Sequence, residues 1–248
     1  MLGGVILGIA TGSLLGLLGG GGSVIAVPIL IYLLGLEAKE AIGTSLVIVG
    51  LASLLGAWSH YSKHSVIVST ALIFGATGAI GSFAGAKIGQ LIPDALQLAI
   101  FATVMALVAF LMLKQAKPTE TQTENDAKTA LPVVLASGLG AGVLTGLIGV
   151  GGGFVIVPAL TILLRLPIRK AIGTSLLVIG INSMVGAISY ASRLGLHYTA
   201  LPFAVGTLAA APVAGHLSHH LPQQKLKSSF AILLLILSAW ILLKQIWH

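Results

Sequence analysis

The stretch Gly19-Gly20-Gly21-Gly22-Ser23-Val24-Ile25-Ala26-Val27-Pro28 interrupts an otherwise apolar run, and the chain repeats it. The second copy, Gly149-Val150-Gly151-Gly152-Gly153-Phe154-Val155-Ile156-Val157-Pro158, lies 130 residues later. At the same offset, Gly43-Thr44-Ser45-Leu46 matches Gly173-Thr174-Ser175-Leu176, and residues 12–58 share 23 of 47 positions with residues 142–188. An unbroken register over this length indicates a duplicated unit.

The composition predicts an integral membrane protein. Hydrophobic residues make up 56% of the 248 residues and charged residues 8%, and the mean hydropathy is +1.06. These are too few charged side chains to cover a water-soluble surface. A spanning helix needs about 20 mostly apolar residues. Seven windows supply them: 41–59, 66–87, 95–113, 131–148, 171–189, 199–217 and 228–243.

The net charge of +7 does not indicate a nucleic-acid partner. The Lys and Arg residues fall mostly in connecting loops without interleaved aromatic residues, so we interpret them as topology signals. The amino terminus lacks the basic region of a cleavable signal, and we expect the first apolar segment to be retained. The absence of cysteine excludes disulfides and thiolate metal sites.

The first 33 apolar residues, 2–34, are too long for one straight span. One helix of that length would measure about 50 Å, against a hydrocarbon core of about 30 Å. A break is expected at Gly19 to Gly22, because each glycine costs about 1 kcal/mol in a helix interior. The sequence therefore predicts two short helices, 2–18 and 23–34, across an unwound turn that must be buried in protein or line a wet cavity.

The domain organisation follows from the repeat. Residues 1–113 form a first membrane repeat, 114–130 a flexible polar linker, and 131–248 a second repeat, each with a glycine-broken hairpin and about three spanning helices. If the hairpin returns to its own side, nine basic residues share the linker's face and four share the other: Lys63, Lys114, Lys117, Lys128, Arg165, Arg169, Lys170, Lys225 and Lys227 against Lys39, Lys87, Arg193 and Lys244. The positive-inside rule then favours inverted halves, with the linker in the cytoplasm and both termini outside.

The acidic residues argue against an enzyme. All six fall in loops or at expected helix ends: Glu37, Glu40, Asp94, Glu120, Glu124 and Asp126. Catalysis by paired carboxylates, a metal site of His plus carboxylate, or a cation relay would need an acid at membrane depth. We therefore expect no catalytic residue, no metal and no cofactor. A cation carrier that uses backbone carbonyls is the less favoured alternative.

The glycine stretches suit an anion better. Each opens a short helix, whose free amide groups carry an effective positive charge of about half a unit. In inverted transporters such interrupted helices meet near the midplane and bind anionic groups. The expected substrate-binding residues are Gly21, Gly22, Ser23, Gly151, Gly152 and Gly153. The alternative is that these glycines only allow close helix packing.

Other polar residues are candidates for the same site: Thr44, Ser45, Thr174, Ser175 and Asn182. Hydroxyls near a helix start also bond commonly to their own backbone, and Asn182 could instead make an interhelical hydrogen bond. For His216 a buried core histidine is favoured over a titrating group, and Lys87 is expected to anchor at the interface. We assign no role to His60, His64, His197, His219 and His220.

These residues resemble a known family. The paired glycine turns that end in Val-Pro, the Ala-Ile-Gly-Thr-Ser repeats at Ala41 and Ala171, and the stretch Gly81-Ser82-Phe83-Ala84-Gly85-Ala86-Lys87-Ile88-Gly89 are similar to the TauE/SafE sulfite exporter family. The resemblance covers nearly the whole chain. It implies a multi-span inner-membrane permease for sulfite or organosulfonates.

The sequence thus predicts a permease that exports a small sulfur-containing oxyanion from a bacterial or archaeal plasma membrane. The expected partners are the anionic substrate and the lipid bilayer, with a homodimer left open and no nucleic acid. The alternative function is a non-transporting assembly or scaffold component of the membrane. An intramembrane enzyme comes third.

Overall fold

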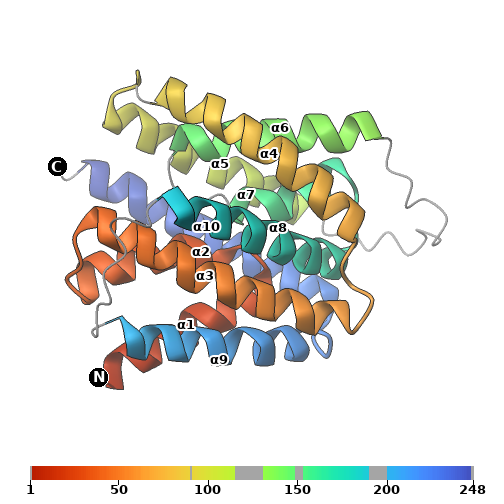
Figure 1. Ribbon diagram of the computed structural model, residues 1–248. Coiled ribbons are helices and arrows are strands. Elements are labelled where there is room, and N and C mark those ends of the chain that lie inside the picture. The colour runs from red at the N-terminus through yellow and green to blue at the C-terminus, as the bar shows by residue number, and fades with distance from the viewer. Residues whose placement is uncertain (1, 90, 115–130, 149–152, 190–199, 247–248) are drawn as a thin grey trace.

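The computed structural model describes residues 2–89, 91–114, 131–148, 153–189 and 200–246, and these residues are helical apart from short connections. Figure 1 shows the helices lying roughly along one direction, with both ends of the chain on the same side. The elements, in chain order, are α1 (Leu2–Leu18), α2 (Gly21–Pro28), the π-helix η1 (Ile29–Leu33), α3 (Ala38–Tyr61), α4 (Val68–Gly89), α5 (Asp94–Lys114), α6 (Leu131–Ile148), α7 (Gly153–Pro158), the π-helix η3 (Ala159–Leu163), α8 (Ile168–Ser189), α9 (Leu201–Ser218) and α10 (Gln223–Ile246).

Helices from the two halves of the sequence pack against each other in reciprocal pairs. The first helix of each half, α1 or α6, packs along the fourth helix of the other half, α9 or α4. The matched helices α3 and α8 contact each other, and so do α5 and α10. Figure 1 shows α1 beside α9 at one side of the bundle and α6 beside α4 at the other.

Glycine allows the contact between α1 and α9 to be very close. A Cβ atom at Gly8, Gly12 or Gly16 would overlap the carbonyl oxygen of Phe203, Thr207 or Ala211, respectively. Because small residues let helix backbones approach in a membrane, this stripe of glycines, one per turn, explains the pairing.

Glycines also allow a close contact between α4 and α6. A Cβ at Gly81 would overlap the Leu139 carbonyl, one at Gly85 the Val143 carbonyl, and one at Gly142 the Gly78 carbonyl. At Gly81 and Gly85 of α4 the backbone of another helix therefore lies directly against the glycine.

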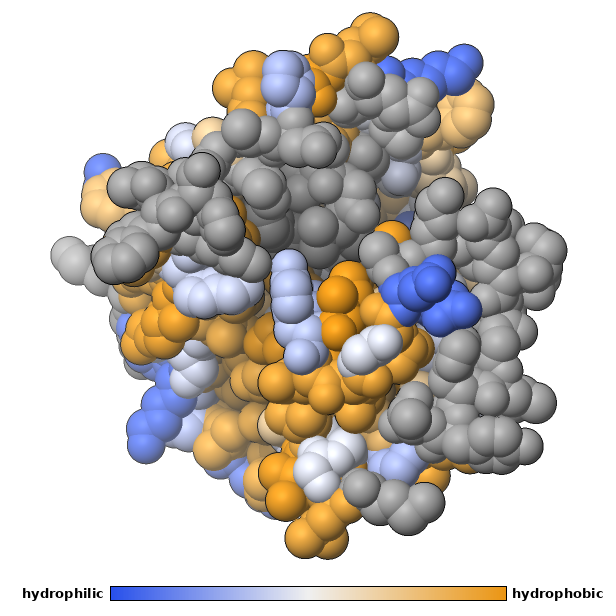
Figure 2. All heavy atoms as spheres, turned by 90° about the vertical axis from the view of Figure 1, so that its left-hand side faces the viewer, coloured by the Kyte–Doolittle hydropathy of each residue, from blue (hydrophilic) through white to orange (hydrophobic). Residues whose placement is uncertain are grey.

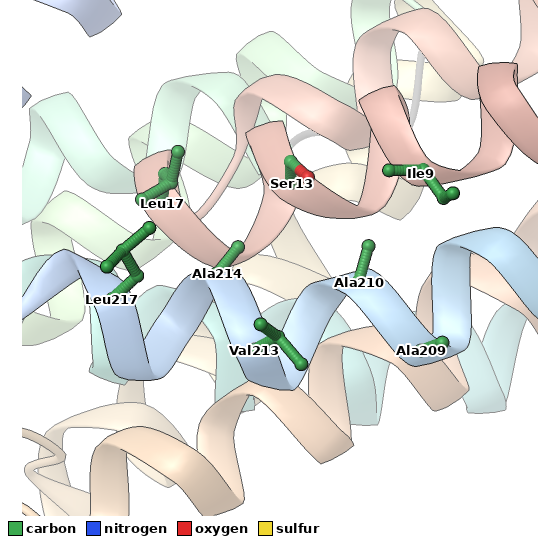
Figure 3. Close-up of a pocket in the computed structure, with 8 residues that line it drawn as sticks. All are labelled: Ile9, Ser13, Leu17, Ala209, Ala210, Val213, Ala214 and Leu217. Atoms are coloured by element: carbon green, nitrogen blue, oxygen red, sulfur yellow. The ribbon is translucent and has the colours of Figure 1, made fainter.

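An apolar groove follows the outer edge of the α1–α9 pair. It has a volume of about 350 Å³ and is lined by Ile9, Ser13, Leu17, Ala209, Ala210, Val213, Ala214 and Leu217. Figure 3 shows Ser13 as the single hydroxyl among these side chains. The groove therefore offers too few hydrogen-bond donors to hold an anion.

Length and hydropathy make the protein a multi-pass membrane protein. Within the described residues, five helices are long and apolar enough to span a bilayer, namely α3, α4, α8, α9 and α10. Shorter apolar helices accompany them. Large apolar side chains such as Trp58 and Phe83 are exposed, as lipid contact requires. Figure 2, which views one end of the bundle, shows hydrophilic side chains scattered among apolar ones.

The break in the first hairpin is shorter than predicted. α1 ends at Leu18 as expected, but α2 begins at Gly21 rather than at residue 23, so only Gly19 and Gly20 lie outside the helices. Gly19 has a φ of +77°, a conformation that favours glycine. The predicted second arm, 23–34, changes to a π-helix after Pro28, which lacks the amide hydrogen that a regular helix would use.

The second arm of this hairpin returns beside the first. A Cβ at Gly4, near the start of α1, would lie 3.9 Å from Leu34 Cδ2, just after η1. Farther along, a Cβ at Gly22 would overlap the Thr11 carbonyl oxygen. The two arms therefore lie side by side, with the Gly19–Gly20 turn at their closed end.

Candidate functional site

The starts of α2 and α7 meet inside the bundle. A Cβ at Gly153, the first residue of α7, would overlap Ser23 Oγ and would lie 3.3 Å from the Gly20 carbonyl oxygen. Gly153 is buried, and Ser23 is 8% exposed. Two segments 130 residues apart thus contact each other through the matched positions of the repeat. Gly151 and Gly152, also predicted for the site, lie outside the described residues.

The turn before α2 contacts the second half as well. A Cβ at Gly19 would lie 2.6 Å from Ser175 Oγ and 3.0 Å from the Ile172 Cα. The backbone of the turn therefore approaches α8 where Ser175 is buried. Ser23, Gly153 and Ser175, all predicted site residues, surround the same two-residue turn.

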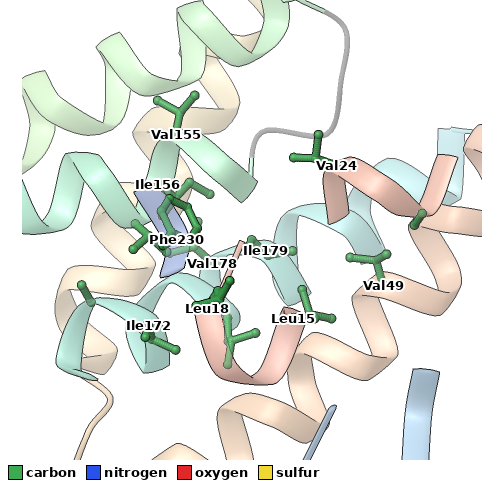
Figure 4. Packing of buried hydrophobic residues seen from close by; sticks show 14 of the residues in the cluster. Leu15, Leu18, Val24, Val49, Val155, Ile156, Ile172, Val178, Ile179 and Phe230 are labelled. Atoms are coloured by element: carbon green, nitrogen blue, oxygen red, sulfur yellow. The ribbon is translucent and has the colours of Figure 1, made fainter. Parts of the chain in front are cut away.

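Gly21 and Gly22 are tightly packed. A Cβ at Gly22 would lie 2.7 Å from Leu15 Cβ, and one at Gly21 would lie 2.7 Å from Leu233 Cδ2. Figure 4 shows the apolar side chains that pack near α2 and α7, including Leu15, Leu18, Ile156, Ile179 and Phe230. These two glycines are thus needed for close packing, whether or not their amide groups also bind a ligand.

The predicted hydroxyls are engaged with backbone. Ser23 Oγ donates to the Gly20 carbonyl at 2.7 Å, Ser45 Oγ to the Ile42 carbonyl at 2.8 Å, and Ser175 Oγ to the Ile172 carbonyl at 2.8 Å. Thr174 Oγ1 accepts a hydrogen bond of 3.1 Å from the Ile67 amide, just before α4. Each serine hydroxyl thus donates its one hydrogen to a nearby backbone carbonyl, so to bind an anion it would have to turn away from that carbonyl. Thr44 is half-buried.

Asn182 and Ser53 add polar atoms between the central helices. Asn182 is half-buried on α8, and a Cβ at Gly75 of α4 would lie 3.6 Å from its Oδ1. Ser53, which the sequence did not single out, is fully buried on α3, and its Oγ has no hydrogen-bond partner among the described residues. A buried hydroxyl of this kind is costly unless a ligand or water satisfies it.

Sequence reasoning missed a group of basic residues at the shared end of α3, α8 and α9, which we call the basic cluster: His60, Lys63, Arg169, His216, His219 and His220. His60 is fully buried, its Nε2 lies 3.3 Å from the Gly16 carbonyl oxygen, and its ring centroid is 4.9 Å from that of His219. Arg169 Nη2 donates to the Leu221 carbonyl at 2.7 Å. The sequence analysis assigned His60 no role and so missed that its side chain is buried.

The electrostatics of His219 reflect its neighbours. Burial lowers the pKa of His219 below its usual value, and the positive charges of Arg169 and Lys63 lower it further, with smaller contributions from His216 and His220. The unfolded chain binds a proton at such a histidine more readily than the folded protein does. His219 should therefore lower the free energy of unfolding as the pH falls below the unfolded pKa of about 6.5, and should not lower it above that pH.

Two other expectations concern His216 and Lys87. His216 is exposed on the last turn of α9, so the prediction of a buried core histidine is wrong. Lys87 is exposed near the end of α4 and lies over the Phe83 ring at 4.9 Å, as an interfacial anchor would.

The fold and these contacts define a class, a multi-pass helical membrane protein in which the start of α2 in the first half contacts the start of α7 in the second. Comparison with known families identifies it further, because the profile of "Sulfite exporter TauE/SafE" matches residues 4–241. The chain belongs to the TauE/SafE sulfite exporter family, a family of membrane transporters.

Named relatives agree with this assignment. A "Probable membrane transporter protein" of Xylella fastidiosa is 34% identical over 241 residues, covering 93% of this chain and 90% of the relative. The "Probable membrane transporter protein YdhB" of Bacillus subtilis is 33% identical over 225 residues, covering 88% and 90%. A third relative, from Methanocaldococcus jannaschii, is 28% identical over 213 residues, covering 81% and 78%.

Proposed function

We propose that the protein exports a small sulfur-containing oxyanion, sulfite or an organosulfonate, through a midplane site at the two glycine-rich breaks. The observation that carries the proposal is the contact of Gly153 with Ser23 Oγ and the Gly20 carbonyl. The first four amides of a helix have no partner within the helix. Amide groups from both repeats would therefore face one small volume without a fixed negative charge.

The proposed binding mode is weak and reversible. Backbone amides and hydroxyls at a helix start attract an oxyanion through the helix dipole, about half a unit charge. The site has no Lys or Arg in the two matched stretches themselves, so the anion is not held by a full ion pair. Weak binding of this kind suits a carrier, which must release its substrate.

The proposed topology is a pair of inverted repeats with both termini outside the plasma membrane. Contacts run in opposite order along α3 and α8, because Gly50 faces Met184 whereas Gly56 faces Leu176. The first hairpin also returns to the side where it starts, as the approach of Gly4 to Leu34 indicates. The basic residues then concentrate on one face, which the positive-inside rule assigns to the cytoplasm.

The membrane potential alone can drive export of the anion, without a coupled ion. An inside-negative membrane potential favours anion exit by about 2.3 kcal/mol per charge for each 100 mV. Uniport would therefore suffice for export.

Transport should be measured in proteoliposomes loaded with sulfite, or with sulfoacetate in a parallel series. We expect the purified protein to release the anion faster than protein-free vesicles do, and an imposed inside-negative potential should increase the rate. Release at the rate of protein-free vesicles, at every potential and for both anions, would refute the proposal.

A further inference from the structure

The basic cluster contains three buried polar atoms that lack a partner among the described residues. They are His60 Nδ1, Arg169 Nε and His219 Nε2. His60 bonds the Gly16 carbonyl through Nε2, and because a carbonyl oxygen only accepts, Nε2 carries the hydrogen. Its Nδ1 is then left unsatisfied on a side chain with no exposed surface. Buried polar atoms of this kind are costly and call for a bound group.

Among the described residues, the charged groups near these atoms are all basic. His219 faces Arg169, Lys63, His216 and His220, and its ring lies against His60. The sequence contains no Asp or Glu after Asp126. On α3, Glu37 and Glu40 lie at the opposite end, about 30 Å from His60 at 1.5 Å per residue. Carboxylates of these helices therefore do not balance the cluster.

The basic side chains of the cluster favour an oxyanion over a cation as the bound group. A cation is disfavoured by Arg169 and Lys63, and no group of three or more metal-ligating residues occurs in the described part of the chain. A guanidinium beside imidazoles suits an oxyanion, because Arg presents several donors in a fixed plane that matches oxygen pairs. A doubly charged anion would balance more of the surrounding positive charge than a singly charged one.

We propose that the basic cluster is a binding site for a doubly charged oxyanion, held by the Arg169 guanidinium with the imidazole of His219. The site is formed by the ends of α3, α8 and α9 and uses none of the residues of the proposed glycine site. It does not rest on the proposed export function, because binding can be measured without transport.

The geometry also connects the basic cluster to the glycine break. His60 contacts the Gly16 carbonyl, and Gly16 lies one helical turn before Gly20. The same edge of the His60 ring also lies near α9, because a Cβ at Gly215 would lie 3.3 Å from His60 Nε2. The Gly19–Gly20 turn follows the carboxyl end of α1, and His60 contacts that same end of α1. An anion bound at the basic cluster would therefore lie at the end of the bundle that is closer to this turn.

Binding should be tested by calorimetry on the full protein in nanodiscs of neutral lipid, with sulfate as the probe because its charge is constant between pH 6 and pH 8. We expect saturable binding that is tighter at pH 6, since a protonated His219 adds positive charge. Arg169→Gln should weaken binding about tenfold or more, as the loss of a charge-assisted hydrogen bond implies. His219→Gln should remove most of the pH dependence.

The matched control is Lys225→Gln, which removes one positive charge from an exposed residue near the start of α10. It should change the affinity less than threefold. The proposal is wrong if sulfate does not bind, or if Arg169→Gln and His219→Gln behave like the control. A second arm uses nanodiscs with phosphatidylglycerol and no sulfate. In each arm the thermal unfolding of the protein is compared with that of Arg169→Gln. If phosphatidylglycerol stabilises the protein through Arg169 and sulfate in neutral lipid does not, the cluster binds a lipid headgroup and the proposal of a free oxyanion is wrong.

Discussion

Gly142→Leu should prevent recovery of folded protein from the membrane, whereas Gly140→Leu should not. At Gly142 even a Cβ atom would overlap the Gly78 carbonyl oxygen, so α4 and α6 would have to separate. At Gly140, two residues away on the same helix, nothing lies within 4 Å of a Cβ. Overpacking of a well-packed interior costs about 1–3 kcal/mol for added methylenes, and a displaced helix backbone should cost more.

Size-exclusion chromatography and thermal unfolding in detergent would measure this difference. We expect Gly142→Leu to aggregate or to lose most of its unfolding transition, and Gly140→Leu to match the unmodified protein. If both variants fold equally well, the close α4–α6 contact is absent from the membrane-embedded protein. The equivalent substitution Gly12→Leu, which would overlap the Thr207 carbonyl, should repeat the result on α1 and α9.

Ser23→Ala should lower anion efflux by about tenfold or more while the protein stays folded. The substitution removes a hydroxyl beside the start of α2 and adds no volume. To bind the anion, the hydroxyl would turn from the Gly20 carbonyl to which it donates. A hydrogen bond to a charged group contributes about 1.5–3 kcal/mol, and losing it corresponds to that change in rate. Efflux from proteoliposomes and thermal unfolding should be measured on the same preparations.

Gly153→Ala combined with Ser23→Ala separates a binding role from a packing role. Gly153→Ala alone places a methyl group against Ser23 Oγ and should lower stability. Removing that oxygen in the double variant relieves the tightest contact and leaves the flexible end of Ile179, at 2.9 Å, as the closest atom, so most of the stability should recover. If the glycines serve only packing, as in a scaffold component, efflux should recover with stability. If the turn binds the anion, efflux should stay low.

Much of the fold could be predicted from periodicity and glycine spacing. The bounds of α1 match the predicted first arm, 2–18, and those of α6 match the apolar window 131–148. The turn in the first hairpin lies within the predicted break at Gly19 to Gly22. The start of α2 was misplaced because Gly21 and Gly22 are tolerated in a first turn and packed against Leu15 and Leu233. The π-helix after Pro28 carries no periodic signal of its own.

The candidate site was predicted in part. The repeat placed Ser23 and Gly153 at matched positions, and the structure brings them together. The basic cluster was missed because His60, Arg169 and His219 are more than 40 residues apart and meet only through the packing of α3, α8 and α9. A signal was available, since a second half with several basic residues contains no acid after Asp126 to neutralise them.

Crystals of the protein soaked with selenite, an oxyanion whose selenium can be located by anomalous X-ray scattering, would test the central claim most directly. We predict a selenium position within hydrogen-bonding reach of the first-turn amides of α2, beside Ser23 and Gly153. Selenium at the basic cluster alone, or at neither place, would contradict a transport site at the glycine breaks.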